Sequence, residues 1–333
     1  MSRAATGMLL GLDIGGSTSR ARLVRGTEIL ADAVATSASL SAAGPAAAAR
    51  ALDDLLSRLP CGPGVLDAVC AGAAGLTATQ TGDFLAARLA PLTRSGTVVV
   101  VEDAALILPA AGLTEGVAVI CGTGSIATGR YRGRQCRAGG WGHLLGDEGS
   151  GYWIVRAAVR TLLGRRDAAE PAGSLGDVLL SAAGTADTTE LHAAFLARPE
   201  PGYWAAAAPT VLDCDDPAVP ALRQDAAAAL ARLAAVVARR LAAPDDGLPV
   251  VLAGGLIAHV GLRAATAAAL RQVLPGSMAV PLTEPPVAGA VRLARAAAGG
   301  PRNDKTGSQA SAPPVITHSH PTGCLLDGRG VGG

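Results

Sequence analysis

The stretch of residues 117–151 reads VAVICGTGSIATGRYRGRQCRAGGWGHLLGDEGSG, and the rest of the chain is best understood from it. It starts with a short apolar run of the kind that forms a buried strand. The run ends in a turn of two glycines and two hydroxyl residues, Gly122, Thr123, Gly124 and Ser125. Glycine lets a backbone approach a ligand closely, and hydroxyls add hydrogen-bond donors. We therefore expect this segment, the 122–125 turn, to hold phosphate groups.

The same stretch continues into a glycine-rich loop, residues 139–151, which also carries Trp141, His143, Asp147 and Glu148. One flat apolar ring among hydrogen-bonding groups is what a sugar-sized polar ligand requires. Plainer roles stay open: the two acids cap a helix predicted from residue 150, His143 braces the loop, and Trp141 fills the core between domains. A zinc site at His143 is excluded, because no set of Cys and His ligands surrounds it.

A turn of the same kind occurs near the start of the chain, where residues 9–24 read LLGLDIGGSTSRARLV. An apolar strand ends at Asp13, and the chain turns through Gly15, Gly16, Ser17 and Thr18, the 15–18 turn. A second strand follows, so the segment is not a dinucleotide-binding fingerprint, which leads into a helix. Taken alone it is an ordinary hairpin. Two such hairpins predict a duplicated fold whose backbone amides form two nests for a nucleotide between the halves.

Apolar runs and helical patterns alternate along the chain, which predicts an α/β protein with mostly parallel strand pairing. Strands are expected at 65–71, 97–101, 248–252 and 277–281, and helices at 46–59, 78–89, 150–163, 221–243, 261–274 and 286–298. Thr77 is a candidate cap for the second helix. Residues 167–220 look like helical segments joined by loops. From residue 299 the composition shifts to Gly, Pro, Ser and Thr, which predicts a disordered tail.

Two aspartates at predicted strand ends are candidates for chemistry. Asp103 follows the β-branched run 97–101, and ligands of α/β sheets bind at the carboxyl ends of strands. A carboxylate there can accept a proton from a substrate hydroxyl during phosphoryl transfer, or it can cap a helix. Glu102 is a poorer base, because the strand pleat directs it to the opposite face. Asp13 either holds Mg²⁺ through water or stabilises its own turn.

Composition excludes several classes of function. The net charge of +1 offers no electrostatic case for nucleic acid binding, and no apolar run is long enough to span a membrane. The six cysteines are scattered without a CxxC pair, which predicts reduced thiols in a cytoplasmic protein. The only lysine is Lys305 and the only asparagine is Asn303, both in the predicted tail. A Walker P-loop, a kinase-type lysine and a Schiff-base lysine are therefore not expected.

The motifs taken in order resemble a known superfamily. These are Asp13 with the 15–18 turn, then Asp103, the 122–125 turn, and Ala253, Gly254 and Gly255. Together they are similar to the ATPase core shared by sugar kinases and actin. The glycine-rich loop GGWGHLLGDEGS closely resembles the N-acetylglucosamine kinase branch, which groups with the BadF/BadG/BcrA/BcrD-type ATPases. The likeness covers residues 9–298.

The resemblance implies an actin-like ATPase fold, a duplicated ribonuclease H-like fold with a nucleotide cleft between two domains. The expected domains are residues 1–104 and 105–298, with helix 286–298 packing back on the first domain, and 299–333 as the tail. It implies transfer of the γ-phosphate of ATP, with Mg²⁺, to the 6-hydroxyl of N-acetylglucosamine, with Asp103 as the base. Residues 16–18 and 122–125 would then hold the phosphates, and Gly254 and Gly255 would flank the adenosine. The sugar side would comprise Thr123, Trp141, Gly142, His143, Asp147 and Glu148.

The chain departs from that family at one position. The loop after the first three strands usually carries an asparagine that touches the sugar, whereas residues 37–41 read SASLS. A serine hydroxyl has shorter reach, so glucosamine and N-acetylmuramic acid remain alternative substrates. A BadF-type activating ATPase with an iron–sulfur cluster and a non-catalytic sugar sensor are the competing classes. The expected partner is a small amino sugar, without nucleic acid or membrane, and a homodimer stays open.

Overall fold

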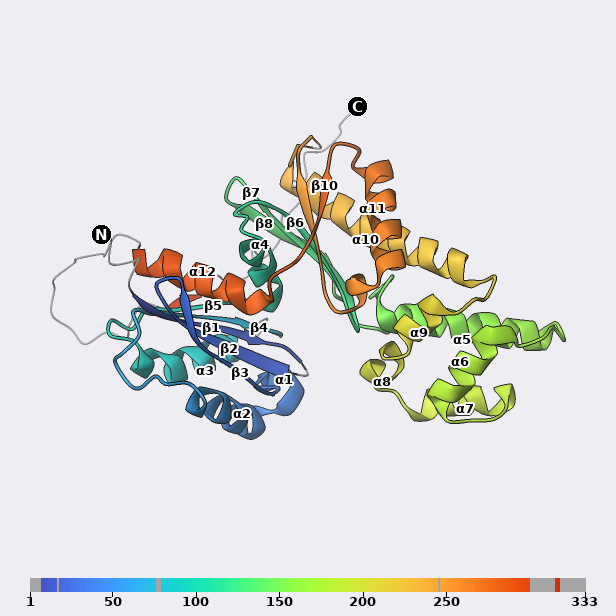
Figure 1. Ribbon diagram of the computed structural model, residues 1–333, viewed down its shortest axis with the longest axis horizontal. Helices are drawn as coiled ribbons and strands as arrows, with labels where there is room; N and C mark the ends of the chain where they lie inside the picture. Colours follow the sequence, from blue (N-terminus) through green and yellow to red (C-terminus); the bar gives the residue numbers. More distant parts are fainter. Residues whose placement is uncertain (1–6, 17, 76–78, 245, 300–314, 318–333) are drawn as a thin grey trace, which may run out of the picture. The chain divides into compact units, whose positions relative to one another are not determined.

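The structure is a computed structural model that describes residues 7–16, 18–75, 79–244, 246–299 and 315–317. The chain folds into two compact units, of which unit 1 is residues 1–112 with 284–333 and unit 2 is residues 113–283 (Figure 1). In the part that the structure describes, no helix combines the length and apolar character needed to cross a membrane.

Unit 1 is a mixed sheet with helices on both faces. Its elements are β1 (Met8–Ile14), β2 (Thr18–Arg25), β3 (Glu28–Thr36), α1 (Leu40–Ala43), α2 (Pro45–Ser57), β4 (Ala68–Ala73), α3 (Thr79–Leu89), η2 (Ala90–Leu92), β5 (Val98–Glu102), η3 (Asp103–Leu106), α4 (Ile107–Ala110), α12 (Pro286–Gly299) and β11 (Val315–Thr317). The strand order is β11-β5-β4-β1-β2-β3. Strands β1 to β3 pair antiparallel, and β1, β4, β5 and β11 pair parallel.

The sheet of unit 1 buries both of its faces because its strands carry apolar side chains in both directions. Leu10 and Leu12 of β1 join one core with Leu52 of α2 and Leu85 of α3. Leu9 joins the core on the other face, which is completed by α12. Figure 1 shows α12 on one side of this sheet and α2 with α3 on the other. Near-continuous apolar runs such as 98–101 are typical of strands covered on both faces.

Within unit 1, helix α12 packs very closely against η3 and α4. A Cβ added at Gly289 would lie 2.0 Å from the backbone oxygen of Leu106, and the Arg292 guanidinium donates to the Pro109 carbonyl oxygen at 2.7 Å. Because η3 and α4 also pack on α12, the first unit ends at Gly112 and not at the expected residue 104. The segment 105–112 therefore belongs with the first sheet.

Replacing Gly289 by alanine is expected to lower the free energy of unfolding by about 1–3 kcal/mol, because the new methyl group overlaps backbone that cannot move aside. The measurement is urea unfolding of the variant against the wild type. Gly164→Ala in α5 is the matched control, since its Cβ meets nothing within 4 Å. A Gly289→Ala variant as stable as this control would mean that α12 is held less closely than the structure shows.

Unit 2 repeats the plan of unit 1 around a second sheet. Its elements are β6 (Gly116–Cys121), β7 (Ser125–Tyr131), β8 (Arg134–Gly139), α5 (Gly151–Asp167), α6 (Gly173–Ala183), α7 (Thr188–Ala197), α8 (Pro201–Ala205), α9 (Ala208–Asp213), α10 (Val219–Leu241), β9 (Pro249–Ala253), η4 (Leu256–Ala258), α11 (Val260–Val273) and β10 (Met278–Pro281). The strand order β10-β9-β6-β7-β8 matches β5-β4-β1-β2-β3 of unit 1.

The predicted α/β class and the duplicated plan are confirmed, and the prediction of mostly parallel pairing holds narrowly, with five parallel and four antiparallel pairs among the described strands. In each unit two antiparallel pairs precede the parallel ones, because both glycine turns connect hairpins. The helical segments expected over 167–220 are α6 to α9. They pack with α5 and α10 around Trp204, which is fully buried and lies 4.5 Å from the Phe195 ring, centroid to centroid.

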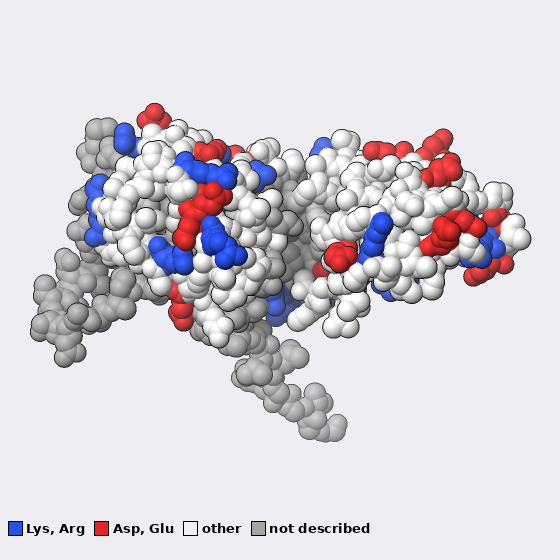
Figure 2. Space-filling model, turned by 90° about the horizontal axis from the view of Figure 1, so that it is seen from below, with Lys and Arg blue, Asp and Glu red and all other residues white. Residues whose placement is uncertain are grey.

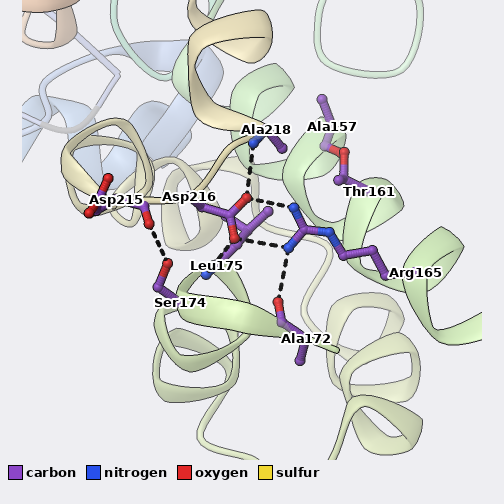
Figure 3. A network of polar contacts seen from close by, with 9 residues as sticks. All are labelled: Ala157, Thr161, Arg165, Ala172, Ser174, Leu175, Asp215, Asp216 and Ala218. Carbon is purple, nitrogen blue, oxygen red and sulfur yellow. Dashed lines mark hydrogen bonds and ion pairs between the residues drawn. The ribbon is translucent and has the colours of Figure 1, made fainter. Parts of the chain in front are cut away.

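A buried ion pair joins three of these helices (Figure 3). The Asp216 carboxylate accepts hydrogen bonds from both terminal nitrogens of the Arg165 guanidinium, at 2.9 and 2.6 Å. It also accepts from the backbone N–H groups of Leu175, in the first turn of α6, and Ala218, just before α10. Arg165 in turn donates to the Ala172 carbonyl oxygen at 3.0 Å. One carboxylate therefore connects the end of α5 to the beginnings of α6 and α10.

Charged side chains of both signs are mixed on one face of unit 1 (Figure 2). The face of unit 1 drawn in Figure 2 has acidic and basic side chains next to one another. Two ion pairs of α2 are of this kind, Asp54 with Arg58 at 2.7 Å and Asp53 with Arg88 at 2.6 Å. On the face in Figure 2 the charge is therefore interspersed, unlike the extended basic field that binds nucleic acid.

The predicted disordered tail is only partly within the described residues. Residues 315–317 form strand β11, which pairs parallel with β5, so the prediction is wrong for this segment. Residues 300–314 and 318–333 lie outside the described residues, and so does Thr77, the candidate helix cap. Five of the six cysteines are described, and these five are free thiols.

Candidate active site

The 15–18 turn connects β1 to β2 in unit 1. The N–H of Gly15 donates to the Thr18 carbonyl oxygen at 3.0 Å, which closes the turn. A Cβ on Gly16 would meet nothing within 4 Å, so the peptide at this position is open to a ligand. Ser17, expected to contribute to the same nest, lies outside the described residues.

The loop that lacks the expected asparagine is hydrogen-bonded to this turn. The Ser37 hydroxyl donates to the Gly15 carbonyl oxygen at 2.8 Å and accepts from the Ser39 N–H at 3.1 Å. The N–H of Ala38 donates to the hydroxyl of Ser19, which is fully buried. The hydroxyl of Ser37 therefore braces the turn. Sequence patterns did not reveal this role, because serines are common in loops of every kind.

Asp13 and Asp103 stand at the carboxyl ends of β1 and β5, which both flank β4 in the sheet. Asp103 is the first residue of the 3₁₀ turn η3, and its own carboxylate accepts from the Ala104 N–H at 2.8 Å. Burial and, to a smaller extent, the charge of Asp103 raise the pKa of Asp13 to about 6, although Arg20 lowers it in part. The pKa of Asp103 is raised by burial and by Glu102, and lowered by the Ala104 N–H.

Of these two carboxylates, Asp13 is the one expected to hold Mg²⁺. No group of three or more His, Cys, Asp or Glu side chains that could hold a metal occurs among the described residues, so no cage of protein ligands is present there. Mg²⁺ with a nucleotide does not need such a cage, because it keeps several waters and binds phosphates with one or two carboxylates. The partly buried Asp13, at the end of β1, fits a hydrated divalent cation held through water.

The 122–125 turn connects β6 to β7 in unit 2 in the same manner. The N–H of Gly122 donates to the Gly124 carbonyl oxygen at 3.0 Å, and Cys121 and Ser125 face each other across the strand pair. Thr123 at the tip is exposed. No atom lies within 4 Å of a Cβ added at Gly122, which leaves one side of the turn open.

The glycine-rich loop folds directly onto this turn. The Ser125 hydroxyl donates to the Glu148 carbonyl oxygen at 2.8 Å, and the Cys121 thiol donates to the Gly149 carbonyl oxygen at 3.4 Å. In the opposite direction, the N–H of Gly151 donates to the Gly122 carbonyl oxygen at 2.8 Å. The predicted phosphate turn and the predicted sugar loop are therefore one hydrogen-bonded assembly.

Neither acid of the loop caps the following helix. The N-cap of α5 is Ser150, whose hydroxyl accepts from the Trp153 N–H at 3.2 Å. Asp147 is 8% exposed, and its carboxylate accepts from the Ser125 N–H at 3.3 Å. Its pKa is raised mainly by burial and also by Glu148, while the Ser125 N–H and His143 lower it. The exposed Glu148 is free to meet a ligand from solvent.

The aromatic residues of the loop divide between solvent and core. Trp141 is 67% exposed, so it does not fill the core of unit 2, and the Arg137 guanidinium lies 5.8 Å from the centre of its ring. His143 packs edge-on against Tyr152 at the start of α5, with 4.9 Å between ring centres. This contact braces the loop, as one of the two expected roles of His143 requires. Gly142, beside them, is exposed with φ 83°, a conformation that favours glycine.

Gly254 and Gly255 follow β9, and the first of them is in contact with the end of β6. With φ 99°, Gly254 would place a Cβ 2.3 Å from the Cys121 carbonyl oxygen, so only glycine fits. The predicted adenosine turn therefore adjoins the 122–125 turn within unit 2. Further along, His259 accepts from the Leu262 N–H at 3.0 Å and contacts Asp213 at 2.9 Å, so it caps α11. A lone histidine in sequence carries no signal for such a cap.

Replacing Gly124 by valine is expected to weaken ADP binding about 5- to 150-fold, because overpacking of this size costs about 1–3 kcal/mol. A Cβ at Gly124 would already lie 2.8 Å from an oxygen of the Asp147 carboxylate. The measurement is titration calorimetry with Mg-ADP, and Gly164→Val in α5, where space is open, is the control. Unchanged ADP affinity would place the phosphate site elsewhere.

Comparison with known proteins agrees with this geometry. Residues 10–291 match the model of the BadF/BadG/BcrA/BcrD ATPase family. An N-acetylmuramic acid/N-acetylglucosamine kinase of Clostridium acetobutylicum is 44% identical over 99 residues, 29% of this chain and 32% of that one. An N-acetyl-D-glucosamine kinase of Dictyostelium discoideum is 52% identical over 66 residues, 20% of this chain and 21% of that one. The matched segments thus span about a third or less of these relatives.

A similar structure extends the likeness to almost the whole fold. The Chromobacterium violaceum protein assigned as an N-acetylglucosamine kinase is 30% identical, with a TM-score of 0.69. The alignment covers 87% of this chain and 99% of that one. The two sheets of equal strand order have the two-domain α/β architecture of the actin-like ATPases and sugar kinases. The chain belongs to the BadF/BadG/BcrA/BcrD ATPase family.

Proposed function

We propose that the protein is an ATP-dependent amino-sugar kinase that converts N-acetylglucosamine to N-acetylglucosamine 6-phosphate and ADP. The observation that carries the proposal is the glycine-rich loop hydrogen-bonded onto the 122–125 turn, since it puts sugar-type and phosphate-type groups side by side within unit 2. Membership of an ATPase family supports the use of ATP. The names of the two curated relatives support an amino sugar as acceptor.

In this mechanism the residues of unit 1 act on the reacting groups. Asp103 accepts the proton of the 6-hydroxyl as the hydroxyl oxygen bonds to the γ-phosphorus and the bond to the β-phosphate oxygen breaks. The raised pKa of Asp103 suits it to this task, since a stronger base accepts the proton more readily. Asp13 would hold Mg²⁺ through water. The cation would supply positive charge to the phosphates, since the described residues include no lysine.

The remaining groups bind and orient. Backbone amides of the 15–18 and 122–125 turns hold phosphate oxygens. Gly254 and Gly255 flank the adenosine, because their backbone is bare of side chains. The sugar is held by Thr123, Trp141, Gly142, His143, Asp147 and Glu148, with the exposed indole of Trp141 as an apolar platform and the acids as hydroxyl acceptors.

N-acetylmuramic acid is the second candidate substrate, and two observations favour it. The hydroxyl of Ser37 is engaged by Gly15 and Ser39, so it is a poor replacement for the absent sugar-binding asparagine. The relative from Clostridium acetobutylicum is named for both N-acetylmuramic acid and N-acetylglucosamine. Loss of one polar contact relaxes discrimination among amino sugars, because a site rejects analogues mainly through polar groups that they leave unpaired.

The test is a coupled ADP-release assay with Mg-ATP and a panel of N-acetylglucosamine, glucosamine, N-acetylmuramic acid, N-acetylmannosamine and glucose. Turnover with N-acetylglucosamine well above glucose is the expected result. A preference for N-acetylmuramic acid or the free amine would reassign the substrate within the same reaction. Silence with every sugar would refute the kinase and favour an activating ATPase or a sugar sensor, which iron analysis and sugar binding without turnover would then separate.

A further inference from the structure

Asp147 has an unusual backbone conformation for a residue with a side chain. Its φ is 60°, in the left-handed region, where Asp and Asn are the most tolerated residues after glycine. The other described non-glycine residues with positive φ are Arg132, Ala169 and Ala242, which lie in a hairpin turn or just after a helix. Asp147 is instead 8% exposed in the middle of a loop. A strained backbone in a buried position persists only where the surrounding structure fixes the residue, and such residues cluster at functional sites.

The carboxylate of Asp147 lies against the peptide that joins Gly124 to Ser125. One oxygen, Oδ1, accepts from the Ser125 N–H at 3.3 Å. The other, Oδ2, lies 2.8 Å from the position that a Cβ on Gly124 would take. Ser125 is 3% exposed, so its N–H has no ready access to water if the carboxylate is removed. This approach needs the absence of a side chain at Gly124, and it occurs with Asp147 in the left-handed conformation.

We propose that Asp147 is the positioning residue of the 122–125 turn: its carboxylate fixes the Gly124–Ser125 peptide in the orientation that binds phosphate, so it sets nucleotide affinity even when no sugar is present. The inference rests on the proposed function, because it takes the turn to be a phosphate site. Among the described residues Oδ2 has no hydrogen-bond donor, so it stays available to a sugar hydroxyl. One carboxylate then serves the turn through Oδ1 and the sugar through Oδ2.

The test compares two replacements of Asp147 that both tolerate the left-handed conformation. Glycine removes the carboxylate without backbone strain, whereas asparagine keeps an oxygen that can accept from Ser125. Mg-ADP binding is titrated by calorimetry without sugar, and the KM values for ATP and sugar are measured separately. Asp177→Asn on the exposed side of α6 is the control for the loss of one negative charge.

We expect D147G to weaken ADP binding about tenfold, the effect of losing a hydrogen bond to a charged group, and D147N to stay within about threefold of wild type. A D147G variant that binds ADP normally and raises only the KM for sugar would overturn the inference. An equal loss in both variants would overturn it too, because the retained acceptor would then have no effect. Failure of the wild type to bind ADP would refute the proposed function itself.

A double-mutant cycle with Gly124→Ala gives a second, independent test. The added methyl group would displace the carboxylate, so Gly124→Ala alone should weaken ADP binding. In the D147G background the obstacle is gone, and the same change should have an effect at least about threefold smaller, since residues in contact are not additive. Additive effects would show that the two positions act independently, against the proposal. Should D147G fail to fold, Asp147→Ala, which also lacks the carboxylate, is combined with Gly124→Ala for the same comparison.

Discussion

Replacing Asp103 by alanine is expected to lower the rate of phosphoryl transfer by about 10²- to 10⁴-fold, the range for losing a general base. Mg-ADP affinity should change little, because the Asp103 carboxylate bonds only its own turn through the Ala104 N–H among the described residues. The measurement is kcat from ADP release with saturating sugar, together with calorimetric binding of Mg-ADP.

Two further variants make this result specific. Asp103→Asn preserves size and the hydrogen bond to Ala104 but cannot accept a proton, so it should be nearly as slow as Asp103→Ala. Asp54→Asn, in an exposed ion pair of α2, should turn over like the wild type. A rate within a few-fold of wild type for Asp103→Asn would remove Asp103 from the role of base and direct attention to its neighbour Glu102.

Replacing Asp216 by asparagine is expected to lower the free energy of unfolding of unit 2 by about 3 kcal/mol, because removal of one partner leaves a buried charge uncompensated. The lower end of the range for buried pairs applies, since the Arg165 side chain keeps 15% of its surface exposed while Asp216 keeps 2%. Urea unfolding followed by tryptophan fluorescence reports on this unit, because Trp141, Trp153 and Trp204 all belong to it.

The control for Asp216 is an exposed ion pair of the same residue types. Asp54→Asn removes the partner of Arg58, and pairs of that kind contribute no more than about 1 kcal/mol. Because Asp54 lies in unit 1, which has no tryptophan, unfolding of both variants is also followed by far-UV circular dichroism. Double replacement of Arg165 and Asp216 by apolar residues should recover part of the lost stability, since no charge is then left unpaired. Equal stability losses for Asp54→Asn and Asp216→Asn would contradict a special role for the pair shown in Figure 3.

The ion pair also predicts how the stability of unit 2 depends on pH. Hydrogen bonds from Arg165 lower the pKa of Asp216 from 3.8 to about 2, with burial acting in the opposite direction. The folded-state pKa is the lower one, so the contribution is fully present above pH 3.8 and is lost as the pH falls through about 2. Wild-type stability should therefore fall over this window more than that of Asp216→Asn, and parallel curves would contradict the prediction.

Much of the architecture follows from local signals in the chain. The apolar runs around the 15–18 and 122–125 turns predict two hairpins, and both are present as β1–β2 and β6–β7. The long helix expected at 221–243 is α10, Val219–Leu241. These signals are reliable because side-chain periodicity, glycine turns and helix-stopping prolines act over a few residues, the same range over which backbone conformation is chosen.

Other features were predicted wrongly where distant segments decide. The boundary between the units was expected at residue 104 but lies after Gly112. The segment after residue 104 stays with unit 1 because the backbone of Leu106 packs directly on Gly289 of α12. The tail expected to be disordered contributes strand β11, which pairs with β5. In each case the partner lies far away along the chain, where no local pattern records it.

The residues of the candidate site show the same division. The sequence by itself determined the residue types, two carboxylates at strand ends, two glycine turns and a loop rich in glycine with Trp141, His143, Asp147 and Glu148. Only the tertiary structure decided that Ser37 braces Gly15, that Ser150 caps α5, and that the Asp147 carboxylate meets Ser125. The reason is physical: chemistry is a property of single side chains, whereas hydrogen-bond partners are chosen by packing of the whole chain, which brings residues far apart in sequence into contact.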